Sequence, residues 1–328
     1  MKASARAYSN IALVKYWGKQ NDGLRLPMNA SLSIGLDAIF TQTTVEFQEN
    51  LAKDLIEIDG DQFDEQETQR VTNHLDLIRD LAKITTRARV GTKNNFPKAV
   101  GAASSASGFA ALTKAAVGAL GLDLSDKELS ILARQGSGSA ARSISGGFCV
   151  WHTGKISEDS FAERIEHPSD WDLRVLLVFV DELKQKEIGS TEGMALTVKN
   201  NPYYAESVRQ AENNIGLAKQ AIEANDFPAL GKVIEDECYR LHAMCMTTTP
   251  NILYWTGSTI DVFQAIYRLR KEGVRAYFTV DAGPHVHVIT QARDLERVKQ
   301  KLQQLSNIHS IVECGVGEAA TLIEDHLF

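Results

Sequence analysis

The sequence of 328 residues lacks several features that mark particular classes of protein. No apolar run reaches the roughly 18 to 20 residues that a membrane-spanning helix needs, so we expect no membrane partner. No CxxC pair occurs, which argues against a zinc site and against a disulfide framework. The four cysteines are scattered through apolar segments and are expected to be packed, reduced thiols: Cys149, Cys238, Cys245 and Cys314.

The sequence also has fewer basic than acidic residues. The chain carries 35 Lys and Arg against 42 Asp and Glu, so its net charge is -7 and a nucleic-acid partner is not expected. Lys15 and Lys19 stand where a secretory signal would need its apolar core, and we expect a cytoplasmic protein. An anionic small molecule remains compatible with this charge, because surface charges are screened beyond about 8 Å and a few buried cations can dominate a pocket.

The composition that remains is that of an ordinary folded protein, with 44% hydrophobic and 23% charged residues, and its length suggests about two domains. Apolar patterns predict strands over residues 5–13, 41–50, 55–63, 87–92, 146–151, 173–181, 274–283, 285–290 and 309–316. Helices are predicted over 67–85, 109–120, 127–135, 203–224, 229–244 and 292–305.

Local signals support several of these elements. Asp59-Gly60 is typical of a hairpin turn, and Ser125 with Glu128 forms a capping box before a helix that Gly136 ends. The helix over 67–85 has an apolar stripe at Val71, Leu75, Ile78 and Leu81. A polar connection over 184–191 separates the two halves, so we predict an N-terminal α/β domain over 1–183 and a C-terminal α+β domain over 184–328.

Two segments rich in small residues and hydroxyls are candidate anion sites. PKAVGAASSASG (97–108) precedes a helix whose unpaired N–H groups and dipole favour an anion such as a phosphate, although its serines could simply cap the helix. It is not a Walker loop. GSGSAARS (136–143) adds the Arg142 guanidinium, which suits a carboxylate or phosphate, although a flexible connector with a surface Arg would look similar.

Two further segments carry charged groups at predicted strand ends. Lys15 and Lys19 lie beside Tyr16 and could converge on phosphate, or they could be solvated surface lysines. Asp281 closes a strand before Gly283-Pro284, where an Asp is most often a turn former. Two histidines follow at 285 and 287 on one predicted strand face, but a pair without a third ligand is weak support for a metal site.

Together these segments resemble the mevalonate diphosphate decarboxylase family of the GHMP kinase superfamily. The resemblance is carried by NIALVKYWGK (10–19), LPMNASLS (26–33), NNFPKAVGAASSASGFAALTKAA (94–116), GSGSAARSISGGFCVW (136–151) and YFTVDAGPHVHV (277–288). It implies the GHMP kinase fold, an N-terminal ribosomal S5-like α/β domain and a C-terminal ferredoxin-like α+β domain with the site between them. It also implies a homodimer.

The resemblance further implies ATP, Mg²⁺ and (R)-5-diphosphomevalonate as ligands, and specific residues for each. The catalytic residues would be Asp281, Lys15 and Arg142. Substrate would contact Asn10, Tyr16, Trp17, Gly18, Lys19, Arg70, Ser137, Gly138, Ser139, Ala140, Ala141 and Ser190. ATP would contact Thr92, Asn94, Gly101, Ala102, Ala103, Ser104, Ser105, Ala106, Ser107 and Gly108, with Ser105 also holding Mg²⁺.

Some positions depart from the family pattern: Ala30, Lys98, Ala102 and His285 stand where Ser, Thr, Leu and Asn are usual, and Thr191 follows Ser190 where bacterial members can carry Arg. Lys98 would add charge near ATP, and His285 would perturb Asp281. The expected reaction is ATP-dependent phosphorylation of the 3-hydroxyl followed by loss of phosphate and CO₂. Two alternatives remain at this point, a kinase of the same fold that stops after phosphorylation, and a ligand-sensing protein without turnover.

Overall fold

The computed structural model describes residues 1–62, 64–96, 104–167, 171–180 and 188–328. Its strands are β1 Lys2–Val14, β2 Lys19–Asn21, β3 Leu26–Pro27, β4 Ser31–Gln48, β5 Leu55–Ile58, β6 Asp61–Gln62, β7 Arg87–Asn94, β8 Phe148–Trp151, β9 Ala162–Ile165, β10 Leu173–Val180, β11 Ala276–Val280, β12 Val286–Gln291, β13 Ile308–Cys314 and β14 Thr321–Ile323. Its helices are α1 Glu65–Ala82, α2 Ser104–Ala119, α3 Asp126–Gly136, α4 Ala140–Ser145, the short 3-10 helix η2 Ser157–Asp159, α5 Ser190–Asn200, α6 Tyr204–Glu223, α7 Phe227–Met246, α8 Gly257–Lys271 and α9 Ala292–Gln303.

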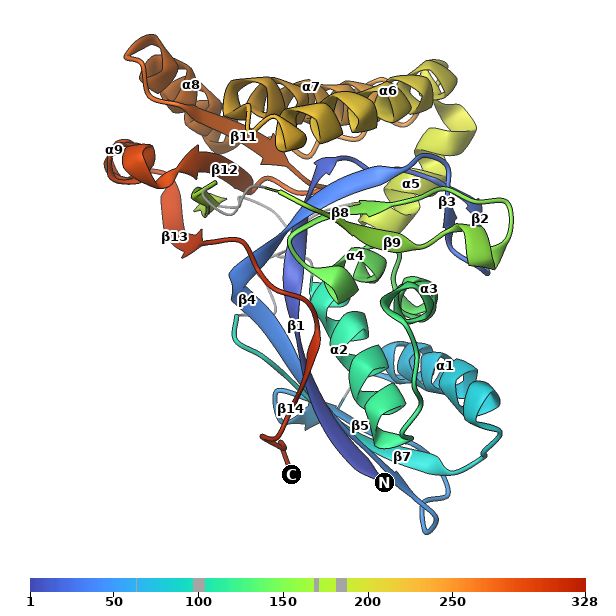
Figure 1. Ribbon diagram of the computed structural model, residues 1–328. Helices are drawn as coiled ribbons and strands as arrows, with labels where there is room; N and C mark the ends of the chain where they lie inside the picture. The colour runs from blue at the N-terminus through green and yellow to red at the C-terminus, as the bar shows by residue number, and fades with distance from the viewer. Residues whose placement is uncertain (63, 97–103, 168–170, 181–187) are drawn as a thin grey trace.

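The first sheet runs in the order β14-β1-β4-β7-β5-β6, and β8 joins it by pairing with β4 and β9. Figure 1 shows α1, α2 and α3 gathered on one side of it. They bury a core that includes Val45 of β4, Val90 of β7, Leu75 of α1 and Phe109 of α2. The long β1 and β4 remain paired as far as Val14 and Leu32, so this sheet carries the end of β1 directly to the second half of the molecule.

The second sheet is antiparallel, with the order β11-β12-β10-β13. The central strand β10 is buried on both faces, as its continuous apolar run predicts. Its side chains alternate between two cores: Leu177 faces the core shared with β1, β4, α6 and α7, while Leu176 faces the core of α8 and α9. The two sheets therefore share one continuous core on the side where β1 ends.

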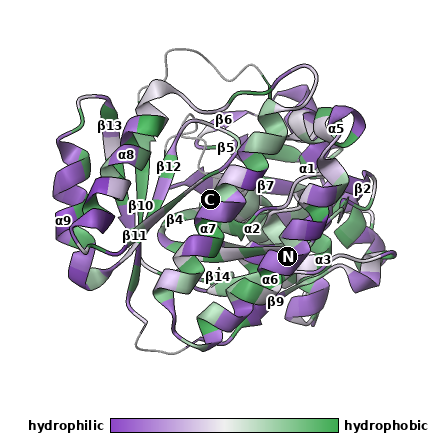
Figure 2. Ribbon diagram, turned by 90° about the horizontal axis from the view of Figure 1, so that it is seen from above, coloured by the Kyte–Doolittle hydropathy of each residue, from purple (hydrophilic) through white to green (hydrophobic). Residues whose placement is uncertain are grey.

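Several sequence predictions are confirmed at the level of single residues. Asp59 and Gly60 both have positive φ, 51° and 88°, and connect β5 to β6. Ser125 and Glu128 make the predicted capping box of α3. The four cysteines are free and buried. Figure 2 shows both hydrophilic and hydrophobic residues on the outer helices. Among them, α9 is largely hydrophilic.

Other predictions need correction. Leu81 is 52% exposed, and the face of α1 that it was expected to complete is instead closed by Arg79, which pairs with Asp54. The final strand of the chain is not β13, because β14 follows it and pairs with β1 of the first sheet. Figure 1 shows this terminal segment crossing back over the first sheet. The pattern analysis also missed α8, which covers the second sheet.

The domain boundary between 183 and 184 falls outside the described residues and stays a prediction. By its pairing, β10 belongs to the C-terminal sheet although it precedes that boundary, and β14 belongs to the N-terminal sheet although it follows it. In the described part of the chain, no helix combines the length and apolar character needed to cross a membrane.

Candidate active site

A polar cavity of about 330 Å³ lies between the end of β1, the start of α4, the start of α5 and the loop after β11. It brings together thirteen of the residues singled out in the sequence: Asn10, Lys15, Tyr16, Trp17, Lys19, Arg70, Ser105, Ser137, Gly138, Ser139, Arg142, Ser190 and Asp281. Thr191, which follows Ser190, lines the same cavity. Segments far apart in the sequence therefore meet at one site.

A close ion pair lines this cavity. The Nζ atom of Lys15 is 2.6 Å from Oδ1 of Asp281, and the Lys15 side chain is 2% exposed while that of Asp281 is 39% exposed. Burial opposes ionisation of Asp281, but the Lys15 ammonium outweighs it and the net pKa of Asp281 is lowered. His287 and Arg142 act in the same direction. Asp281 is therefore a carboxylate at neutral pH, open to the cavity.

The two neighbouring histidines have different surroundings. His287, buried on β12, acts on Asp281 and lowers its pKa. His285 accepts the N–H of Val180 on its Nδ1 atom at 3.3 Å and packs on Phe179, and its effect on Asp281 stays a prediction. His285 precedes the first residue of β12, so it lies outside the strand that carries His287.

Arg142 lies buried in α4 and is held by hydrogen bonds, so it is not the surface Arg of a flexible connector, which was the alternative interpretation. Its Nη1 atom donates to Ser31 Oγ at 2.6 Å and its Nε atom to Asn10 Oδ1 at 3.3 Å. Asn10 in turn donates to Ser143 Oγ at 2.8 Å. Burial lowers the pKa of Arg142, but a guanidinium begins from so high a pKa that it stays charged at neutral pH.

The residues before α4 form the wall of the cavity. Gly138 lies so close to the rings of Trp151 and Tyr16 that an added Cβ would come within 2.8 Å of Trp151. Ser137 Oγ donates to Ser105 Oγ at 3.2 Å, which joins this wall to the first turn of α2. Ala140 and Ala141 are fully buried in α4 and line neither this cavity nor the next, and their contact with substrate stays a prediction.

Position 18 requires a glycine because of its backbone conformation and its close contact with Tyr204. Its φ is +106°, and a Cβ there would lie 1.9 Å from the hydroxyl of Tyr204. That hydroxyl donates to the carbonyl oxygen of Trp17 at 2.7 Å. Gly18 therefore shapes the turn that presents Tyr16 and Lys19 to the cavity, without lining it through a side chain.

A second, more apolar cavity of about 180 Å³ adjoins the first. The two share Arg70 and Ser105, so they form one branched site. Four of the residues expected to bind ATP line the second cavity: Thr92, Asn94, Ser105 and Gly108. The apolar walls that the motifs did not predict come from Ile56, Ile58, Val71, Val90, Phe109 and Leu112.

In the first turns of α2, some residues predicted to bind ATP line the cavities and others are buried in the core. The helix begins at Ser104, so the serines expected in a loop lie within it. Ser107 is fully buried, where its Oγ contacts Ser9 Oγ at 3.1 Å and Thr41 Oγ1 at 2.7 Å, and Ala106 is fully buried beside it. Neither lines the first or the second cavity. Gly101, Ala102, Ala103 and Lys98 lie outside the described residues.

Sequence reasoning missed Arg25, which lines the first cavity beside Arg70. Burial and the neighbouring Arg25 charge together lower the pKa of Arg70 to about 10. Within the part of the chain described here, each guanidinium donates to a backbone carbonyl, of Gln135 and of Gly136, and neither forms a salt bridge. Two cations that face one cavity and form no salt bridge there favour an anionic ligand. No local motif marks Arg25, whose backbone has a φ of 50°.

Comparison with known proteins identifies the family of this chain. The family profiles "Diphosphomevalonate decarboxylase-like N-terminal domain" and "Mevalonate 5-diphosphate decarboxylase C-terminal domain" match residues 7–162 and 176–323. A phosphomevalonate decarboxylase of Haloferax volcanii is 33% identical over 96% of this chain and 94% of its own. A mevalonate diphosphate decarboxylase of Staphylococcus aureus superposes with a TM-score of 0.94 at 36% identity and covers 98% of both chains.

A further solved structure, described as "MDDEF in complex with MVAPP, AMPPCP and Magnesium", has a TM-score of 0.93 at 39% identity over 99% of both chains. Both halves of the chain and its overall structure thus match one family. This chain belongs to the mevalonate diphosphate decarboxylase family.

Proposed function

We propose that this protein catalyses the ATP-dependent decarboxylation of (R)-5-diphosphomevalonate to isopentenyl diphosphate, ADP, phosphate and CO₂. The observation that carries the proposal is the Lys15–Asp281 pair in a cation-rich cavity that adjoins an apolar one. The kinase and sensor alternatives share the fold, but family membership favours the decarboxylase.

The described residues fit ATP and Mg²⁺. The second cavity offers flat apolar walls for a base, with Thr92 and Asn94 as polar groups, and it opens at Ser105 and Arg70 toward the first. Ser105 would supply a hydroxyl ligand to Mg²⁺, an ion that usually takes few protein ligands and many phosphate oxygens and waters. Bound there, Mg²⁺ would neutralise charge on the phosphates during transfer.

Asp281 would orient the tertiary 3-hydroxyl for in-line attack on the γ-phosphorus. Its lowered pKa makes it a weak base before the reaction begins, which favours orientation first and acceptance of the proton as the O–P bond forms. Lys15 would hold Asp281 in place and offset negative charge on the transferring phosphoryl group.

Arg142 would align the carboxylate that leaves as CO₂. Stabilising that carboxylate alone would stabilise the ground state and slow its loss, so the contribution of Arg142 lies in orientation and in stabilising the departing 3-phosphate. Its bonds to Asn10 and Ser31 hold the guanidinium for this task. Loss of the 3-phosphate leaves positive character at C3, and the C1–C2 electrons form the new double bond as CO₂ departs.

The 5-diphosphate would be held by hydroxyls and cations that lie in the same cavity: Tyr16, Lys19, Arg25, Arg70, Ser137, Ser139 and Ser190. A second candidate substrate is 5-phosphomevalonate, which the similarity to the Haloferax volcanii enzyme favours. The guanidinium groups of Arg25 and Arg70, which form no salt bridge among the described residues, favour the more highly charged diphosphate.

The test is an assay of ADP and CO₂ release with MgATP, run on 5-diphosphomevalonate and on 5-phosphomevalonate, for the wild type and for Asp281→Ala. Equal amounts of ADP and CO₂ from the diphosphate, lost by about 10²-fold or more in the variant, would support the proposal. ADP without CO₂ would make the protein a kinase, and nucleotide binding without either product would make it a sensor. Preference for the monophosphate would move it to the second candidate.

A cytoplasmic location and a homodimer belong to the same proposal. Four free thiols are compatible with a reducing compartment. Cell fractionation tests the location, and analytical ultracentrifugation tests the dimer.

A further inference from the structure

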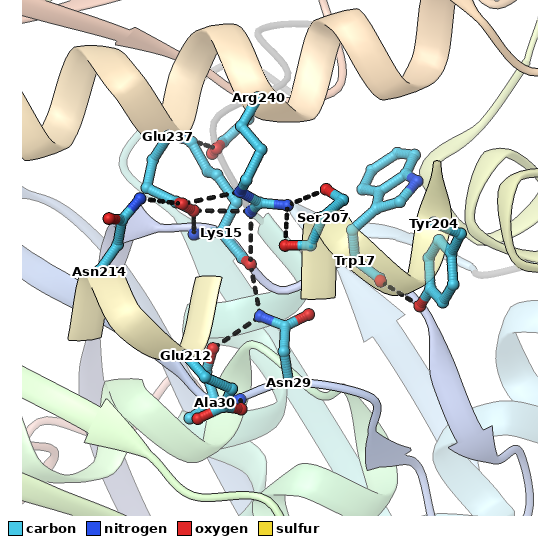
Figure 3. A network of polar contacts seen from close by, with 11 residues as sticks. Lys15, Trp17, Asn29, Ala30, Tyr204, Ser207, Glu212, Asn214, Glu237 and Arg240 are labelled. Atoms are coloured by element: carbon cyan, nitrogen blue, oxygen red, sulfur yellow. Dashed lines mark hydrogen bonds and ion pairs between the residues drawn. The ribbon is translucent and has the colours of Figure 1, made fainter. Parts of the chain in front are cut away.

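A buried polar network on α6 and α7 holds the main chain at the end of β1 (Figure 3). Glu237 of α7 has no exposed surface, and its Oε2 atom accepts the backbone N–H of Lys15 at 2.9 Å. Its charge is compensated by Arg240, which donates to Oε1 at 2.7 Å and to Oε2 at 2.6 Å. Asn214 of α6 donates to Oε1 at 2.7 Å. Both carboxylate oxygens are therefore fully engaged.

The carbonyl group of Lys15 is held from the other side. It accepts Asn29 Nδ2 at 2.8 Å and Arg240 Nη2 at 3.4 Å. Arg240 is itself anchored by Ser207, whose Oγ accepts its Nη1 atom at 2.6 Å. Because β1 ends at Val14, side chains rather than a strand partner fix both polar groups of the Lys15 backbone.

The same helix also holds the strand that carries Asp281. His242 of α7 lies with Nε2 at 3.2 Å from the carbonyl oxygen of Val280, the residue before Asp281. Burial lowers the pKa of His242 to about 3, so the ring is neutral, and the carbonyl partner requires the proton on Nε2. Helix α7 thus contacts the main chain of Lys15 and that of Val280, the residue before Asp281.

We propose that Glu237, together with Arg240, is a positioning residue of the reaction, which fixes the Lys15 backbone so that its ammonium meets Asp281. Neither residue lines the cavity, so neither is assigned a contact with substrate. The inference rests on the proposed function, because it assigns a role in that reaction.

Helix α7 offers a matched control in Glu235. Glu235 accepts a backbone N–H, that of Phe278, at 3.3 Å and an arginine, Arg270, at 2.5 Å. It thus shares with Glu237 its helix, its burial and the type of its partners, but it holds the middle of β11 rather than the end of β1.

The experiment compares Glu237→Gln with Glu235→Gln in steady-state kinetics over a range of pH. We expect Glu237→Gln to lower kcat by about 10²-fold, the scale expected for a small misplacement of a reacting group, with KM for MgATP changed by less than about twofold. We expect Glu235→Gln to leave kcat near that of the wild type.

The pH profile separates positioning from a general loss of structure. When the Lys15 ammonium moves away from Asp281, the acid limb of kcat should move to higher pH by about one unit, because an opposite charge nearby is what keeps a carboxylate ionised. The groups that face Asp281 from the surrounding elements are Lys15, Arg142, His287, His242 and Cys238. Of these, only Lys15 is bonded to Glu237.

If Glu237→Gln does not fold, as judged by circular dichroism, Arg240→Lys and Arg270→Lys form the second pair, because lysine keeps the charge and loses the planar fork. We then expect about a tenfold loss of kcat and the same shift of the acid limb for Arg240→Lys alone. An unshifted acid limb, or a loss of kcat no greater than in the control, overturns the inference while an active wild type leaves the proposed function intact. An inactive wild type overturns the proposed function itself.

Discussion

Lys15→Met removes the positive charge beside Asp281 while keeping a side chain of similar length in a buried position. The Lys15 side chain is 2% exposed, so the apolar thioether suits the site, and the backbone bonds to Glu237 and Asn29 do not depend on the side chain. The substitution therefore tests the ammonium group and not the fold around it.

The expected magnitude follows from the geometry. At 2.6 Å the gross attraction between the two charges is about 6 kcal/mol at an effective dielectric constant of about 20, before desolvation and screening reduce it. Asp281 is 39% exposed, so we discount this figure and use the effect of removing one preorganised donor, about 10²- to 10³-fold in kcat. The pKa of Asp281 should rise, and the acid limb of kcat with it.

The assay is steady-state release of ADP and CO₂, with Lys19→Met as the control. Lys19 lines the same cavity but pairs with the exposed Asp22 at 2.8 Å. It should contribute to uniform binding, so its loss should raise KM for the diphosphate by about tenfold and change kcat little. Retention of kcat within about threefold in Lys15→Met, or an equal fall of kcat in Lys19→Met, would refute the reasoning.

Three further outcomes are expected. Ser105→Ala should raise KM for MgATP, whereas Ser107→Ala should leave KM unchanged and lower the free energy of unfolding by about 1 kcal/mol, because Ser107 bonds only within the core; urea titration and kinetics check both. Arg25→Ala should raise KM for the diphosphate by about tenfold with kcat preserved, because its guanidinium faces the cavity and forms no salt bridge among the described residues. Stability should fall on acidification from pH 6.5 to about 4, by up to about 1.4 kcal/mol per pH unit for each of His242 and His287, because burial lowers their pKa values to about 3 and about 4 and only the unfolded state takes up the protons; urea midpoints at pH 7.5, 6 and 5 measure this, and His287→Gln should reduce the slope.

Several secondary-structure elements and the candidate catalytic residues could be predicted from the sequence, because the patterns that mark them are local. Alternating apolar residues mark β1 and β4, a capping box marks α3, and Asp59-Gly60 marks a turn. The motifs also identified Lys15 and Asp281 as candidates. A strand such as β14 has only three residues, and its place in the sheet depends on β1 rather than on its own pattern.

Contact between distant groups could be decided only by the tertiary structure. Lys15 and Asp281 are separated by 266 positions, and nothing in either segment specifies that α7 holds both. Tertiary structure also decides that Ser105 faces the cavities whereas Ser107 is buried. A helix turns about 100° per residue, so side chains two positions apart point to nearly opposite sides, and the packing of the helix determines which side faces the cavities. The sequence by itself determined which chemical groups are present and in which local elements, while packing determined which of them face the cavity, because burial depends on neighbours that the chain brings together only when it folds.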